Sequence, residues 1–307
     1  MTKRDAQRTG GGVADKLHVS QASLIRVFPR RTPLTPDDDL AFVGGPPLFP
    51  VPARRAHVSC LFTWDRREAG RLAEEWAAQG YKVELGGPAF GGESSEFEPG
   101  LYVKNGATIT SRGCIRHCPF CFVPEREGPL RTLEIKPGWD ILDNNLLACP
   151  RKHVEAVLAM LNEQPRAARF TGGIDARLCR PWFAARLAAM RLDILYMAYD
   201  MPETWSAVER TIGLMRGAGI GQRKVGCYVL VGYEGDTLAD AERRLSMVLE
   251  CGGMPFAMYY RGADWTGKPP SGWARLVRSW SRPAAIFAKE INDAQRDDLL
   301  NLSGKKL

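Results

Sequence analysis

The segment ATITSRGCIRHCPFC (residues 107–121) joins a short stretch of alternating apolar and polar residues to three closely spaced cysteines. Alternation with a period of two is typical of a β-strand, so we expect ATITSRG to form one. Cys114, Cys118 and Cys121 follow that strand and are expected at its carboxyl end. Because α/β proteins carry their functional groups at the carboxyl ends of parallel strands, the segment predicts a site together with a strand.

Strand and helix patterns alternate about six times between Ala107 and Tyr260. Further strands are expected in WDILD, ARFTGG, LDILYMAYD, KVGCYVLVG and MPFAMYY. Pro, Gly, Asp and Thr signals delimit the expected helices, which span residues 151–164, 181–191, 203–218 and 237–251. Such alternation builds a parallel sheet with helices outside it, so we expect an α/β fold that is a barrel or a partial barrel.

The 307 residues divide into four expected regions, and this length suffices for one large α/β domain with an appendage or for two modest domains. Residues 1–18 are polar and glycine-rich, which predicts a disordered tail. Residues 19–106 hold a proline-rich wrap and a small βαβ unit made by HVSCLFTW, an amphipathic helix and YKVELGGP. Residues 107–262 form the expected core, and residues 263–307 a C-terminal helical extension.

The composition is ordinary for a globular protein, with 45% hydrophobic and 25% charged residues. No apolar run approaches the roughly 20 residues that a membrane span requires, so no membrane partner is expected. The N-terminus lacks the apolar region of a secretion signal, which predicts a cytoplasmic location. In that reducing compartment, clustered cysteines indicate metal binding or catalysis more than disulfides.

The spacing C-x3-C-x2-C can bring three thiolates to one metal centre. A structural zinc ion needs four protein ligands, and the nearby fourth candidate, His117, is awkwardly adjacent to Cys118. An iron-sulfur cluster held by three thiolates leaves one iron open to a substrate. The alternatives are an iron-sulfur enzyme, or a zinc- or iron-sulfur-stabilised nucleic-acid-binding module without catalysis. Three buried structural cysteines are the remaining interpretation.

The run Cys114-Ile-Arg-His-Cys118-Pro-Phe-Cys121 resembles the signature of radical S-adenosylmethionine (radical SAM) enzymes, and the resemblance covers about residues 107–260. It implies a partial (β/α)6 TIM-like barrel, a four-iron, four-sulfur (4Fe-4S) cluster on the three cysteines, and S-adenosylmethionine chelated at the open iron. An electron donor such as flavodoxin or ferredoxin then reduces the cluster, and S-adenosylmethionine is cleaved to a 5′-deoxyadenosyl radical. The resemblance also implies that Phe120 packs near the adenine.

Further elements are similar to landmarks of this family. FTGG contains Gly172 and Gly173 and resembles the glycine-rich element that accepts the methionine amino group, although a tight strand-to-helix turn also explains it. The run Ile-Leu-Asp143-Asn-Asn145 resembles an element of the cobalamin-associated and methylthiotransferase-like branches. It implies that Asp143 or Asn145 contacts cofactor or substrate, and the alternative is an Asx turn. GYEGDT, which contains Asp236, resembles their G-x-P-G-E-T element or an ordinary helix N-cap.

The same branches carry an N-terminal Rossmann-like domain that binds cobalamin, and residues 62–92 resemble a shortened, degenerate version of it. The cobalt ligand in those domains is a histidine within D-x-H-x-x-G, and here Arg67 stands at the histidine position. Arginine stays protonated and cannot ligate cobalt. Cobalamin held by a histidine is therefore not expected, whereas cobalamin without a protein ligand stays open.

The other five cysteines are scattered singly. Only Cys60 precedes the cluster, which is too few for the second cluster of a methylthiotransferase. Cys227 and Cys251 lie in apolar contexts and are expected to be packing residues. Cys149, beside the Asn-Asn loop, is the candidate to face the active cleft.

The net charge of +7 and a pI near 9.0 leave room for an anionic partner. Four arginines surround the cysteine segment: Arg112, Arg116, Arg126 and Arg131. They favour an anionic substrate, such as a nucleic acid or a phosphorylated metabolite. A solvated surface, a tuned cluster potential or pairing with the carboxylate of S-adenosylmethionine explains them as well.

Overall fold

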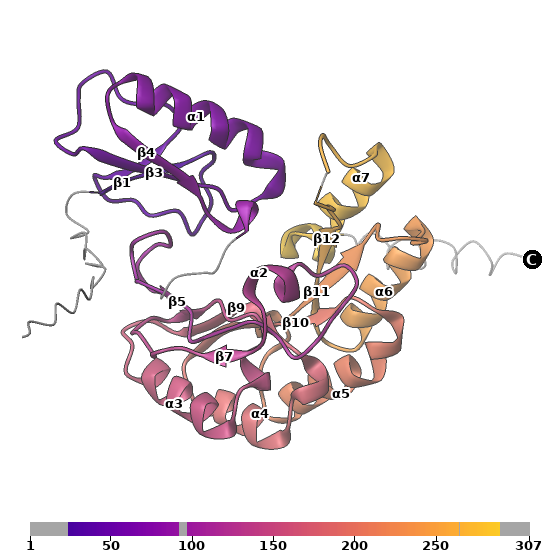
Figure 1. Ribbon diagram of the computed structural model, residues 1–307. Coiled ribbons are helices and arrows are strands. Elements are labelled where there is room, and N and C mark those ends of the chain that lie inside the picture. The colour runs from indigo at the N-terminus through magenta and orange to yellow at the C-terminus, as the bar shows by residue number, and fades with distance from the viewer. Residues whose placement is uncertain (1–23, 92–96, 264, 289–307) are drawn as a thin grey trace, which may run out of the picture.

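The computed structural model describes residues 24–91, 97–263 and 265–288, and most of its strands form two separate parallel sheets (Figure 1). The fold class is therefore α/β, as expected. The tail predicted at residues 1–18 and the end of the C-terminal extension, residues 289–307, lie outside the described residues.

The N-terminal sheet has four parallel strands in the order β2-β1-β3-β4. Their bounds are β1 Leu24–Phe28, β2 Ala41–Val43, β3 Arg55–Ser59 and β4 Lys82–Gly86. Helix α1 (Arg66–Ala78) connects β3 to β4 and buries Ala69, Leu72 and Trp76 in the core of this unit. The parallel pairing of β3 with β4 confirms the predicted βαβ unit.

The proline-rich segment contributes two strands to this sheet, where the sequence predicted only a wrap. Strand β1 lies between β2 and β3 and buries four of its five residues, because LIRVF is mainly apolar. The prolines begin at Pro29, after the strand, where a missing N–H breaks no ladder hydrogen bond. Arg26 is buried within β1, and its guanidinium pairs with Asp38 and donates to the Gly100 carbonyl.

The second sheet has six parallel strands in the order β12-β11-β10-β9-β8-β5, so its strands follow one another in chain order. Their bounds are β5 Ala107–Thr108, β8 Asp140–Ile141, β9 Ala168–Ile174, β10 Leu192–Tyr199, β11 Val225–Val231 and β12 Met254–Tyr259. Within the described ranges, β5 and β12 each pair with one neighbour and form the two edges.

Helices connect the strands of this sheet at the predicted positions. Their bounds are α3 Arg151–Asn162, α4 Pro181–Ala188, α5 Trp205–Gly217 and α6 Leu238–Glu250. Figure 1 shows them together on one side of the strands. Their apolar faces share one core with the sheet, in which Phe170, Phe183 and Leu195 are fully buried. Each helical crossover returns the chain to the same end of the sheet, so the carboxyl ends of the strands meet at one edge.

A short hairpin and a helix frame the cysteine loop. Strands β6 (Ser111–Arg112) and β7 (Arg131–Thr132) pair antiparallel, and helix α2 (Val123–Glu127) follows the cysteines. Gly113 has φ +78°, and a Cβ there would collide with the backbone that follows α2. Only glycine therefore allows the chain to turn directly from β6 into the cysteine loop.

The described part of the C-terminal extension contains helix α7 (Ser271–Trp280), in agreement with the predicted helical character. Leu276 and Trp280 on this helix are buried in the core of the second sheet. No helix among the described residues has the length and apolarity needed to cross a membrane.

Candidate functional site

Three thiols gather at the carboxyl edge of the second sheet. Cys114, Cys118 and Cys121 line one pocket of about 150 Å³. Residues at or just beyond the carboxyl ends of β8, β9 and β10 complete it, among them Asn145, Gly172, Gly173, Asp175, Arg177 and Asp200. These segments are far apart in the sequence, and they converge because parallel strands end at the same edge.

Hydrogen-bond donors face the cysteine sulfurs. The Cys114 Sγ accepts hydrogen bonds from the Arg116 backbone N–H and from Asn145 Nδ2, both at 3.4 Å. The Cys121 Sγ accepts one from the Val123 backbone N–H at 3.5 Å. Donors of this kind favour the thiolate form and tune an iron-sulfur cluster when one is bound.

Burial determines the charge of two of these cysteines in the metal-free chain. It raises the pKa of both Cys118 and Cys121, and the neighbouring thiols raise the pKa of Cys121 further. Both side chains are therefore protonated at neutral pH. A bound metal centre has to displace these protons, so its binding depends on pH.

Asp175 ties the cysteine loop to the end of β9. Its carboxylate accepts hydrogen bonds from Arg116 Nε at 3.0 Å and from Arg177 Nε at 2.7 Å. Arg177 also donates to Cys118. Burial alone would raise the pKa of Asp175, but the two guanidinium groups hold that pKa below its ordinary value. The carboxylate stays ionised and holds both arginines beside the cysteines.

Asp200 brings a second carboxylate to the pocket from the end of β10. Burial raises its pKa to about 6, because desolvation outweighs the backbone N–H of Leu230 and the charges of Arg177 and Arg244. A carboxylate with such a pKa can carry a proton or face a cationic ligand. Perturbed groups of this kind mark candidate functional sites.

The predicted glycine pair forms part of the pocket wall at the end of β9. A Cβ on Gly172 would overlap the backbone of Leu142 and Asp143, so only glycine permits this close approach. Gly173 has φ +88°, and a Cβ there would lie 3.9 Å from the Tyr228 ring. Both glycines therefore have a backbone reason for their presence, and both face the pocket.

The two polar residues predicted after β8 have different roles. Asn145 lines the pocket, donates to Cys114, and has a buried Oδ1 without a partner among the described residues. Asp143 is 1% exposed, and its oxygens accept the Thr110 N–H, the Thr110 hydroxyl and the Ser111 hydroxyl at 2.6 to 2.7 Å. Its carboxylate is saturated by the strand before the cysteines. The predicted contact of Asp143 with cofactor or substrate has no support in these bonds.

Other predicted residues are also placed by the structure. Phe120 lines the pocket and meets Tyr233 edge to face at 5.6 Å, and its packing against an adenine stays a prediction. Cys149 is buried in the core and does not line the pocket, so the structure gives no support to the idea that it faces the cleft. Cys227 is buried as expected, and Cys251 is half-buried against the same core.

The GYEGDT segment after β11 forms the start of α6. Thr237 is the N-cap and accepts the Asp240 N–H at 3.1 Å. Asp236 accepts the Gly232 N–H at 2.8 Å and two hydrogen bonds from Arg244, both at 2.9 Å. These residues do not line the cysteine pocket, which favours the helix-start interpretation.

Most arginines around the cysteine loop are engaged within the chain. Arg112 pairs with Glu127 at 2.9 Å, Arg116 is held by the carboxylate after β9, and Arg131 donates to the Glu127 carbonyl. Arg126 instead lies over an aromatic ring. The first three therefore contribute little to the case for an anionic substrate.

Sequence reasoning missed Arg177, because an isolated arginine after a strand carries no motif. His117, the fourth zinc ligand that was considered, is exposed. Within the described ranges, no group of three or more His, Cys, Asp or Glu side chains converges closely enough for a single metal ion.

The chain matches no protein-family model and no curated protein. The function is therefore argued from the geometry of the pocket.

Proposed function

We propose that the chain is a radical SAM enzyme that holds a 4Fe-4S cluster on Cys114, Cys118 and Cys121 and cleaves S-adenosylmethionine reductively. The observation that carries the proposal is the shared pocket, where the three thiols meet the glycine pair near the carboxyl end of β9 and Asn145 after β8. The resemblance to the radical SAM family rests on these same segments of the sequence. The reaction's final substrate is not assigned by this pocket.

The donor set of the pocket supports a cluster. A 4Fe-4S cluster is larger than one ion and is held by thiolates at its corners, so its ligands need not converge on one point. The three thiols line a common pocket without forming a single-ion site in the described structure. N–H donors reach the sulfurs of Cys114 and Cys121, and the Arg177 guanidinium reaches Cys118.

In this proposal the side chains bind and orient, and a bound cluster supplies the electron that breaks the sulfonium bond. The Oδ1 of Asn145, which has no partner in the described part of the chain, and the exposed backbone at Gly172 offer acceptors to the methionine ammonium group. Asp200 offers negative charge to a cationic ligand. Arg177 is positioned by Asp175 and keeps positive charge beside Cys118, which favours its thiolate.

We infer that the second sheet is the partial (β/α)6 barrel of this family. Its strands follow one another in chain order, and helices connect them on one side, as in a barrel. The N-terminal sheet, with α1 between β3 and β4, takes the place of the Rossmann-like domain. Arg67, at the position of the cobalt-ligating histidine, is exposed, so the proposal includes no histidine-held cobalamin.

The cluster is tested by anaerobic reconstitution of the full chain, followed by iron and sulfide counts and by electron paramagnetic resonance after reduction. We expect one oxygen-sensitive cluster in the wild type and loss of most of it in Cys118→Ala. Cys149→Ala, a buried cysteine outside the pocket, is the matched control and should keep the full iron content. A full cluster in Cys118→Ala, or zinc in its place, contradicts the proposal and favours the zinc-stabilised binding module.

The reaction is tested by adding a reductant and S-adenosylmethionine and measuring 5′-deoxyadenosine. We expect slow release by the wild type without any substrate, and none above background by a variant that lacks the three cysteines. Absence of product from wild-type protein with verified cluster content counts against the enzyme.

A further inference from the structure

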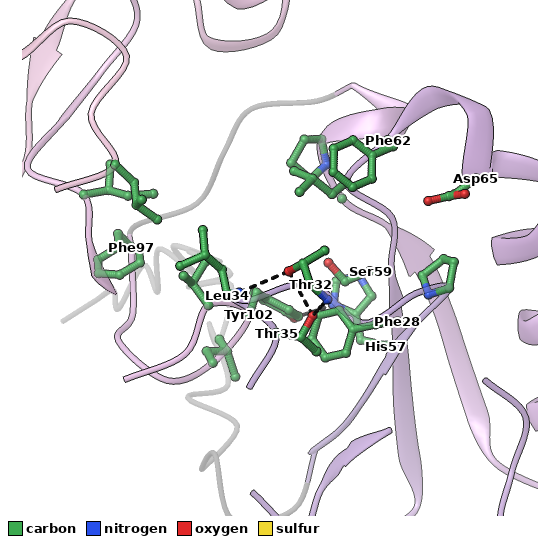
Figure 2. Close-up of a pocket in the computed structure, with 18 of the residues that line it drawn as sticks. Phe28, Thr32, Leu34, Thr35, His57, Ser59, Phe62, Asp65, Phe97 and Tyr102 are labelled. Carbon is green, nitrogen blue, oxygen red and sulfur yellow. Dashed lines mark hydrogen bonds between the residues drawn. The ribbon is translucent and has the colours of Figure 1, made fainter. Parts of the chain in front are cut away.

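A second and larger cavity, of about 410 Å³, lies at the carboxyl ends of β1, β3 and β4. Its described lining shares no residue with the cysteine pocket. Residues 107–262, the region of the second sheet, contribute Ile109, Leu142 and Arg126 to it. Figure 2 shows aromatic rings around this cavity, with Phe97 on one side and Phe62 on the other. Its volume is in the range of small-molecule sites, about 300 to 1,000 Å³.

Two arginines within residues 107–262 lie over aromatic rings, and one of them, Arg126, lines this cavity. Arg126 lies 4.7 Å from the centre of the Phe122 ring. Arg261 lies 4.7 Å from the rings of both Trp64 and Trp265, which meet edge to face at 5.7 Å. Because Trp64 belongs to the N-terminal unit, these contacts join the two units.

The N-terminal unit adds two pairs of the same kind. Arg30 lies over Phe62 and Arg66 over Phe90, each at 5.9 Å. Phe62 stacks on Trp64 with ring centres 4.7 Å apart and planes 10° apart. We call these four arginines and their five rings the arginine-aromatic cluster.

This cluster carries more positive charge than the nearby carboxylates neutralise. Arg30 pairs with Asp65, whereas Arg66, Arg126 and Arg261 have no ion-pair partner in the part of the chain that the structure describes. Burial and the charge of Arg66 lower the pKa of Arg126, and burial and the charge of Arg30 lower that of Arg261. Nearby carboxylates oppose both shifts more weakly. The arginines thus repel one another, and an anion would relieve that repulsion.

We propose that the arginine-aromatic cluster binds a nucleotide unit, with the base stacked on its rings and the phosphate on its arginines. Aromatic faces stack on any base, and arginine both stacks and pairs with phosphate. The ligand is a free nucleotide or part of a single strand, because bases within a duplex are not open to stacking. This binding goes beyond the proposed function and does not require it.

The test uses the full-length protein and fluorescence anisotropy with labelled single-stranded DNA and RNA of about 12 nucleotides, within the usual range of site sizes. Adenosine and uridine monophosphates are titrated by calorimetry in parallel. We expect a Kd at or below roughly 10⁻⁴ to 10⁻⁶ M for the single strand, rising steeply with salt. Unlabelled duplex of the same length should compete less well than the single strand.

Three variants separate charge from stacking. Trp265→Ala should weaken binding between about 5-fold and about 150-fold, the cost of one lost stacking contact. Arg126→Ala should weaken binding and reduce the salt slope by about 0.7, and Arg126→Lys should keep the slope. The control is Arg151→Ala, because Arg151 also lies 4.7 Å over a tryptophan, Trp182, but has a carboxylate partner in Glu155. It should bind as the wild type does.

The outcomes discriminate among the sources of the ligand. Tight single-strand binding identifies a nucleic acid, and binding of monophosphates alone identifies a free nucleotide. No saturable binding of either probe, preference for duplex, or equal loss in Arg151→Ala and Arg126→Ala overturns the proposal. Release of 5′-deoxyadenosine is measured on the same samples, so that a failure of nucleotide binding is distinguished from a failure of the proposed reaction. Circular dichroism of each variant confirms that it is folded.

Discussion

Replacing Arg244 by Met should destabilise the second sheet by about 3 to 5 kcal/mol, the cost of leaving a buried charge without its partner. Arg244 and Asp236 are each 9% exposed and share two hydrogen bonds of 2.9 Å. Arg244 also donates to the Leu230 carbonyl at 3.0 Å. For a domain of this size, about 2 to 4 °C per kcal/mol converts the loss to a fall in Tm of roughly 6 to 20 °C.

Removing both charges should cost less than removing one. In the double variant Asp236→Leu/Arg244→Met no charge is left buried, and mainly the Gly232 N–H loses its acceptor, at about 1 to 3 kcal/mol. The control is Arg243→Met on the same helix, because Arg243 is 67% exposed in its pair with Asp240. It should change the free energy of unfolding by about 0.5 kcal/mol or less.

The assay is urea unfolding of the metal-free proteins under reducing conditions, followed by far-ultraviolet circular dichroism and completed as a double-mutant cycle. Strict additivity of the two single variants, or an Arg244→Met variant as stable as Arg243→Met, refutes the reasoning. Either result means that the pair contributes no more than a solvent-exposed one.

Three further predictions concern the cysteine pocket. Asp175→Asn leaves Arg116 and Arg177 without their carboxylate partner. It should lower the free energy of unfolding in urea by about 1 to 3 kcal/mol and reduce iron content after reconstitution. Wild-type values in both measurements contradict the positioning role of Asp175. Gly172→Ala should cost about 1 to 3 kcal/mol by overpacking, whereas Gly213→Ala, in α5 with open space around it, should stabilise by about 0.5 to 1 kcal/mol; thermal unfolding compares them. The pKa of Asp200 is raised to about 6. The free energy of unfolding of the wild type should therefore fall by about 2 to 3 kcal/mol relative to Asp200→Asn as pH rises from about 4 through about 6. An equal difference in stability between the two proteins at pH 4.5 and at pH 7.5 is the contrary result.

The sequence by itself determined most elements of the second sheet, although the single strand predicted over ATITSRG divides into β5 and the hairpin strand β6. Helix α6 begins after the N-cap Thr237, α4 begins at Pro181, and both starts agree with the prediction to within about one residue. Caps, prolines and apolar spacing act within a few residues of one another, so they can be read along the chain. The cysteine spacing was equally local, and it correctly indicated that three thiols share one pocket. The N-terminal sheet was predicted less well, because β1 is short and lies next to prolines.

Only the tertiary structure decided which side chains surround the cysteines. Arg116 and Asp175 are 59 residues apart in sequence and meet because the cysteine loop and the end of β9 reach the same edge of the sheet. The carboxylate of Asp143 accepts hydrogen bonds from Thr110 and Ser111 on the neighbouring segment for the same reason. The arginine-aromatic cluster likewise draws on both units of the chain. Such partnerships depend on long-range packing, which brings distant segments together and leaves no spacing pattern in the sequence.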